Sequence, residues 1–146
     1  MKLKTYVIIL SRFFPKGHKR AGEPTGFKEK FRKEKLYSIR ANYEYWEKIF
    51  EEIYKGDACL SVRQWSGLPY RSKQVELMRL TREDGIGLQR LEHIGPLGLP
   101  FVGPNVILSN AIAQNDGLSY EDWKDWFKNY DTSKPMAIIH FTGFRY

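Results

Sequence analysis

The chain has 146 residues, 42% of them hydrophobic, which is enough for one domain with a packed core over residues 1–146. The net charge is +7, and the first forty residues hold twelve lysines and arginines against three glutamates. The single cysteine, Cys59, excludes an intramolecular disulfide and favours a reducing, cytoplasmic location, while the apolar run Tyr6 to Leu10 is too short for a secretory signal or a membrane span.

The basic N-terminal part contains four predicted elements. Residues 3–11 read as a buried strand, and residues 14–23 form a loop rich in glycine, proline and cations. A short helix is predicted from Pro24 or Thr25 through about Lys33, and a short strand over residues 35–40 follows it. Because this uneven positive charge suits a polyanion, we expect RNA or a nucleotide as the partner, with solubility alone as the alternative.

The clearest predicted helix covers residues 42–55. Asn42 is a good N-cap, Gly56 ends the helix, and an apolar stripe at helical spacing is expected in the core: Trp46, Ile49, Phe50 and Ile53. Beyond it, strands are predicted over residues 58–65, 73–81 and 86–93, the first two joined by a hairpin turn at residues 66–69. Cys59 lies in the first of these strands and is expected to pack in the core.

The C-terminal part begins with a Gly- and Pro-rich stretch, residues 95–104, which we interpret as an ordered connector. Short helices are predicted over residues 106–114 and from Ser119, with Asp122 completing a capping box. The second helix carries another apolar stripe, expected in the core: Trp123, Trp126, Phe127 and Tyr130. A strand over residues 136–142 ends the order, which predicts an α+β domain with a curved sheet or small barrel of mostly antiparallel strands and helices outside.

The stretch Lys35-Leu36-Tyr37-Ser38-Ile39-Arg40 places two cations and a hydroxyl within a predicted strand. Alternation puts Ser38 and Arg40 on one face and Lys35 on the other. A buried lysine needs a partner or a lowered pKa and can then act as a general base, with a nearby hydroxyl as nucleophile. The alternative is an edge strand whose cations face water.

Two further groups carry candidate chemistry. Asn115-Asp116-Gly117 is ordinary turn chemistry, but Asp116 beside a lysine would hold or orient its charge. Aromatic and basic side chains meet around one hairpin and could stack on bases and contact phosphates, or simply be a solvated hairpin: Arg63, Trp65, Tyr70, Arg71 and Lys73.

Metal and cofactor chemistry is not expected. No pair among His18, His93 and His140 has metal-ligand spacing, and the lone cysteine supplies no thiolate cluster. The sequence also lacks a Gly-rich phosphate loop before a helix and a Gly-x-Ser-x-Gly elbow.

Taken together, three pieces of the sequence resemble the ASCH family of the PUA-like superfamily, small β-barrel domains associated with RNA. Lys35, Ser38 and Arg40 stand at the matching places of the family's Gly-x-Lys-x-x-(Glu/Thr)-x-Arg motif. The other two pieces are the turn Lys55-Gly56-Asp57 before an apolar strand, and the run from Asp116 to Trp123 with the closing strand Ile139-His140-Phe141. The resemblance implies a PUA-like barrel with the motif in a cleft.

The resemblance also implies residue roles. One subgroup removes the acyl group of N4-acetylcytidine, and by analogy Lys35 would be the base, Ser38 would replace a threonine, and Asp116 would replace a glutamate as proton shuttle or lysine partner. The family's glycine is Lys33 here, Ser38 lacks the threonine methyl, and Asp116 is one methylene shorter than glutamate.

Three functions follow from these observations. The first is an RNA- or nucleotide-binding module, without metal or cofactor, whose cleft is lined by Lys35, Ser38, Arg40 and Asp116. Its rim would be extended by Arg12, Lys16, Lys19 and Arg20, with Arg63, Trp65 and Tyr70 as further ligand contacts. The second is a metal-independent amidohydrolase acting on an acylated nucleobase, and the third is a protein-interaction module using Tyr70 and the C-terminal Phe144-Arg145-Tyr146.

Overall fold

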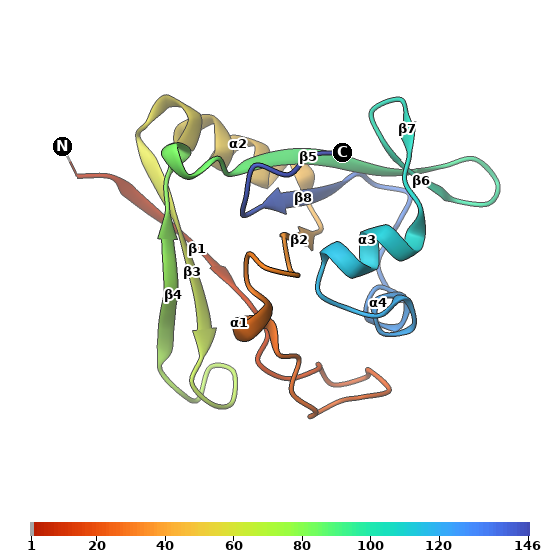
Figure 1. Cartoon of the computed structure of the whole chain (residues 1–146), viewed down its shortest axis with the longest axis horizontal. Coiled ribbons are helices and arrows are strands. Elements are labelled where there is room, and N and C mark those ends of the chain that lie inside the picture. The colour runs from red at the N-terminus through yellow and green to blue at the C-terminus, as the bar shows by residue number, and fades with distance from the viewer. Residues whose placement is uncertain (1) are drawn as a thin grey trace.

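The computed structural model describes residues 2–146 as an α+β fold (Figure 1). Eight strands and four α-helices follow one another, with a 3-10 turn, η1, at Arg82–Asp84. The strands are β1 (Lys4–Ile9), β2 (Tyr37–Arg40), β3 (Ala58–Trp65), β4 (Gln74–Leu80), β5 (Gly87–Ile94), β6 (Leu99–Val102), β7 (Asn105–Val106) and β8 (Met136–His140). The helices are α1 (Phe27–Lys30), α2 (Tyr43–Lys55), α3 (Ser109–Asn115) and α4 (Tyr120–Trp126).

The first sheet has three strands in the order β1-β3-β4. β1 runs parallel to β3, with Lys4 opposite Ala58 and Ile9 opposite Arg63, because α2 and β2 lie between them in the chain and form the crossover. β3 and β4 form an antiparallel hairpin whose register shifts once, between Val62 and Arg63. β3 is buried on both faces from Ala58 to Val62, and buried and partly exposed side chains alternate from Arg63 onward. The end of this hairpin reaches the side of the molecule that carries α1 (Figure 1).

The second sheet has five antiparallel strands in the order β2-β8-β5-β6-β7. β8 lies between β2 and β5 and is buried on both faces, as its unbroken apolar run Met136-Ala137-Ile138-Ile139 predicts. His140 pairs with Tyr37 on one side and with Gly87 on the other. Within residues 2–146 the strands form two separate sheets, so the expected small barrel is not closed.

The α2 stripe is confirmed as core. Trp46, Ile49, Phe50 and Ile53 are all buried, and Gly56 ends the helix in the left-handed conformation that glycine tolerates best. Cys59 is also fully buried, as expected. The α4 stripe was only partly correct, because the helix ends at Trp126 and Tyr130 is 38% exposed.

Several predicted boundaries were wrong for local reasons. The helix expected from Pro24 to Lys33 is only Phe27–Lys30, since Gly26 and Arg32 both adopt positive φ and interrupt it on either side. The supposed connector 95–104 contains β6, because Gly95 and Gly98 turn the chain back onto β5. The helix predicted at 106–114 is Ser109–Asn115.

The caps differ in detail as well. Asn42 precedes α2 in the left-handed conformation and makes no side-chain capping bond. Ser119 caps α4 by accepting a bond from the Asp122 amide at 3.2 Å. The Asp122 carboxylate, however, pairs with Arg20 instead of returning to the cap. None of the helices in the described residues is both long and apolar enough to cross a bilayer.

Candidate functional site

The sequence motif is centred on a buried ion pair between Lys35 and Asp116. Lys35 Nζ lies 2.6 Å from Asp116 Oδ1 and also donates to the Asp116 carbonyl at 3.0 Å. The two residues form an isolated antiparallel β-bridge, which places the loop after α3 against the segment before β2. Gly117 has φ +78°, and a Cβ there would lie 3.0 Å from the Lys35 side chain, so this close approach requires glycine.

Burial disfavours the charged forms of Lys35 and Asp116, whereas the attraction between the two groups favours them. Lys35 is 2% exposed and Asp116 is 3% exposed. Burial lowers the pKa of Lys35 and raises the pKa of Asp116, while the attraction between the two groups acts against both shifts. The ammonium also lies 4.0 Å from the centroid of the Phe27 ring, which supplies a cation–π contact.

Ser38 and Arg40 complete the polar group. Arg40 Nη1 donates to Ser38 Oγ at 3.2 Å, and Arg40 Nη2 donates to the Ile9 carbonyl of β1 at 2.6 Å. The strand predicted over residues 35–40 is shorter than expected. β2 begins only at Tyr37, so strand alternation does not reach Lys35, and both side chains line one cavity.

This cavity is small. Its volume is about 20 Å³, and its lining includes all four motif residues, which are Lys35, Ser38, Arg40 and Asp116, together with apolar side chains such as Phe27, Leu118, Trp126 and Phe127. Such a space accommodates about one water molecule. In this conformation the buried lysine, hydroxyl and carboxylate could bind and polarise a water, but a nucleobase does not fit beside them.

A much larger groove lies next to the cavity. It has a volume of about 460 Å³, within the range of small-molecule sites. One wall comes from the segment after β1 and from α1, and the other from the inner face of the β3–β4 hairpin. The lining comprises Arg12, Phe13, Pro24, Gly26, Phe27, Lys28, Glu29, Gln64, Trp65, Ser66, Val75 and Leu77. Phe27 borders both spaces and forms the partition between them.

The predicted contacts divide between this groove and other surfaces. Arg12 and Trp65 line the groove, and Arg12 also donates to the Ser66 carbonyl. Arg63 lies on the opposite face of β3, where it donates to Ser61 Oγ at 2.8 Å and to Gln74 Oε1 at 3.0 Å. Tyr70 stacks on Trp65 with ring centroids 5.2 Å apart and is 89% exposed.

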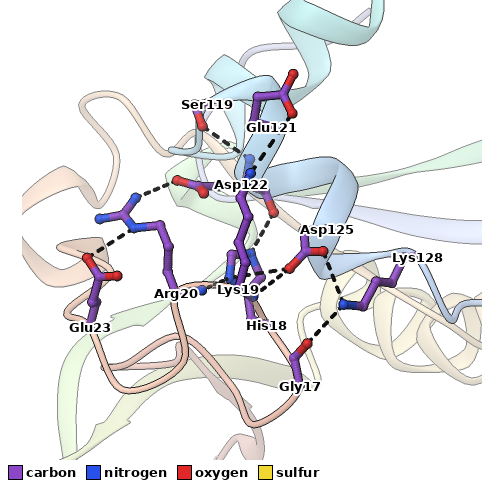
Figure 2. A network of polar contacts seen from close by, with 10 residues as sticks. All are labelled: Gly17, His18, Lys19, Arg20, Glu23, Ser119, Glu121, Asp122, Asp125 and Lys128. Atoms are coloured by element: carbon purple, nitrogen blue, oxygen red, sulfur yellow. Dashed lines mark hydrogen bonds and ion pairs between the residues drawn. The ribbon is translucent and has the colours of Figure 1, made fainter.

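The loop 14–23 contacts α4 (Figure 2), and none of its residues is in the lining of the cavity. Arg20 pairs with Asp122 and Glu23, while Lys19 Nζ lies 3.9 Å from Glu121 and its amide donates to Asp125 at 2.7 Å. Lys16 is exposed and lines neither space. Lys19 and Arg20 therefore form ion pairs within the chain, which leaves less of their positive charge available to a ligand.

His18 anchors the loop to α4 (Figure 2). Its Nδ1 accepts the Arg20 amide at 2.9 Å, so Nε2 carries the proton and donates to the Asp122 carbonyl at 2.9 Å. The ring also packs 4.6 Å from Phe14 and 5.9 Å from Trp126. Since Trp126 lines the cavity, this contact fixes one wall of the cavity.

The C-terminal aromatic residues considered for protein interaction pack largely against the body. Tyr146 shares a 2.7 Å hydrogen bond with the Tyr37 hydroxyl, and its backbone bonds to Gln89 on β5. Tyr37 also donates to the Ile112 carbonyl of α3 at 2.7 Å. Tyr146 thereby joins β2, β5 and α3. Of the aromatic residues named for the protein-interaction hypothesis, Tyr70 is the one that remains largely exposed.

Sequence reasoning missed Phe13, Lys28 and Gln64 as groove residues. Gln64 could have been found, since Ala58, Leu60, Val62 and Gln64 alternate along β3 and the last is the first polar residue at an inward position. Phe13 and Lys28 gave no comparable signal, because nothing in the local pattern shows which segments face each other.

Comparison with known proteins identifies no relative of this chain. The chain matches no protein-family model, no curated protein and no solved structure in searches of each kind. Among residues 2–146, no three histidine, cysteine or acidic side chains gather as a metal site would require.

Proposed function

We propose that the protein binds single-stranded RNA or a nucleotide in the groove between α1 and the β3–β4 hairpin. The observation that carries this proposal is the convergence of two unpaired cations with aromatic side chains in one space of nucleotide size. Arg12 comes from the segment after β1 and Lys28 from α1, while the aromatic residues Phe13, Phe27 and Trp65 border the same space. Rings that stack on bases and cations that contact phosphates are the usual means of binding single strands.

The charges of the groove support an anionic ligand. Arg12 and Lys28 form no ion pair among the described residues, so both remain available to a phosphate. Glu29 is the single acid in the lining and weakens the positive field. Lys19 and Arg20 already form ion pairs with Glu121, Asp122 and Glu23, which makes Arg12 and Lys28 the better candidates for contact with a phosphate.

We include in this proposal the PUA-like architecture and the ASCH resemblance that the sequence suggested. The Lys35–Asp116 pair and Ser38 then form the polar cavity on one side of Phe27, and the ligand occupies the groove on the other side. This arrangement keeps the motif beside the ligand while the nucleotide itself occupies the larger space.

The test is titration of labelled single-stranded RNA between about 50 and about 200 mM salt. We expect wild-type binding to weaken steeply with salt. Arg12→Glu and Lys28→Glu should each weaken binding to all sequences alike. Loss of each phosphate contact should reduce the slope of log K against log salt by about 0.7. Glu29→Gln should strengthen binding, since it removes the acid of the groove.

Lys48→Glu provides the matched control, because Lys48 is exposed on α2, away from the groove. It makes the same change in net charge and should leave the affinity close to wild type. Equal losses in all three charge-reversed variants would mean a diffuse charge effect and contradict the groove. No RNA binding at low salt would contradict the proposed function and favour the protein-interaction hypothesis.

A further inference from the structure

Gln64 places a neutral amide in the wall of the groove. It lies near the end of β3 on the inward face, opposite Val75 of β4, and is 8% exposed. Within residues 2–146 its side chain makes no hydrogen bond, although its strand neighbour Arg63 makes two on the other face. The amide nitrogen and oxygen are not sealed off from solvent, and Gln64 lines the groove, so both atoms are free to bond to a ligand there.

The position suits recognition of a base edge. The other polar side chains of the lining are charged or belong to the exposed Ser66, so Gln64 is the only amide there. Both neighbours of Gln64 in β3 are paired with β4, which fixes the backbone from which the amide projects. An amide offers a donor and an acceptor in one plane, and Phe13 and Trp65 border the same space.

We infer that Gln64 determines base specificity in this groove, and that the preferred ligand is an adenine-containing single strand. The inference rests on the proposed function. The glutamine carbonyl accepts the adenine amino group while its NH₂ donates to a ring nitrogen, which is the bidentate pairing that glutamine makes with adenine. Arg12 and Lys28 then contact phosphates, and these contacts carry no sequence information.

The experiment compares oligoadenylate, oligouridylate and oligocytidylate of about eight nucleotides at one low salt concentration. We expect wild-type protein to prefer oligoadenylate by about tenfold. Gln64→Leu should remove this preference while leaving the affinity for oligouridylate and the salt dependence unchanged. Oligoadenylate with N6,N6-dimethyladenine, which lacks the amino donor, should bind wild type no better than oligouridylate.

Gln74→Leu is the matched control, because Gln74 lies on the same hairpin and bonds to Arg63 on the outer face. This variant should keep the adenine preference. A preference that survives Gln64→Leu, or wild-type protein that binds all three oligomers equally, would overturn the specificity inference and leave the groove intact. Wild-type protein that binds none of them would overturn the proposed function and the inference together.

Discussion

The Phe27 ring lies 4.0 Å from the Lys35 ammonium, and the same ring borders the groove. One aromatic side chain therefore separates the motif residues from the space large enough for a nucleotide. It packs against Trp126 at 5.8 Å, so the partition is supported from α4. Any ligand that reaches Lys35 has to displace this ring or the wall that holds it.

This partition leads to a prediction about hydrolysis. We expect the purified protein not to hydrolyse N4-acetylcytidine, because the cavity around Lys35 and Ser38 holds about one water and both side chains are buried. Release of cytidine and acetate, followed by chromatography, tests this. Turnover that persists with a chelator and disappears in both Lys35→Ala and Ser38→Ala, with each variant shown to be folded, would establish the amidohydrolase instead.

The buried ion pair predicts a strong and asymmetric effect on stability. Lys35→Met leaves the Asp116 carboxylate buried without its partner and should reduce the free energy of unfolding by about 3–5 kcal/mol at neutral pH. The double variant Lys35→Met with Asp116→Asn should recover most of this loss, since neither member of the pair is then left buried as an unpartnered charge. Urea unfolding of wild type, the two single variants and the double variant measures the coupling free energy between the two residues. If the losses of the single variants simply add in the double variant, the coupling is contradicted.

His18 predicts local protection of the basic loop. His18→Leu leaves the Arg20 amide without its partner and removes the bond that ties the loop to the Asp122 carbonyl of α4, at a cost of about 1–3 kcal/mol for the unpaired amide. We expect faster tryptic cleavage within residues 14–23 than in wild type. Val62→Ala, which destabilises the core without touching the loop, is the control. Equal acceleration in both variants would assign the effect to global unfolding.

His140 predicts a loss of stability toward acid. Burial in β8, together with the nearby charge of Arg145, lowers the pKa of His140 to about 3. Below its unfolded value near 6.5 the unfolded chain binds a proton that the folded chain does not. Stability should therefore fall with pH between about 6.5 and about 3, by about 1.4 kcal/mol per pH unit from this group.

The measurement is urea unfolding at several pH values between 7.5 and 5 for wild type and His140→Asn, where carboxylates contribute little to the difference. We expect the variant to lose part of the acid dependence of wild type. Asparagine stays neutral across this pH range but is too short to keep the Nε2 contact to Gln89, so the comparison is between the shapes of the two pH profiles. Identical pH profiles would show that His140 does not carry this dependence.

Local pattern predicted the elements whose signals are self-contained. The α2 stripe with Gly56 and the unbroken apolar run of β8 each determine burial without help from distant residues. Lys35 and Asp116 were brought together by resemblance to a family motif, because spacing cannot show that residues 81 positions apart meet. β2 is an edge strand, as the simpler interpretation held, yet Lys35 and Ser38 are buried because the loop after α3 and the end of α4 cover that edge.

The groove was beyond prediction for the same reason. Its two walls come from segments far apart in the sequence, and they face each other only because the β3–β4 hairpin packs near α1 in the folded chain. The positive charge of the N-terminal part predicted a negatively charged partner, but it did not show which surface would bind that partner. Acids on α4 neutralise Lys19 and Arg20 after folding, and composition does not contain that information.

The position of β8 has a consequence for how the molecule is made. β8 lies between β2 and β5, so β2 joins the larger sheet only through a strand about a hundred residues further along the chain. During synthesis β5, β6 and β7 can pair with one another first, whereas β2 has no partner in its sheet until β8 has been made. Such a topology has a high contact order, which places refolding in the slower range of small domains, milliseconds to seconds.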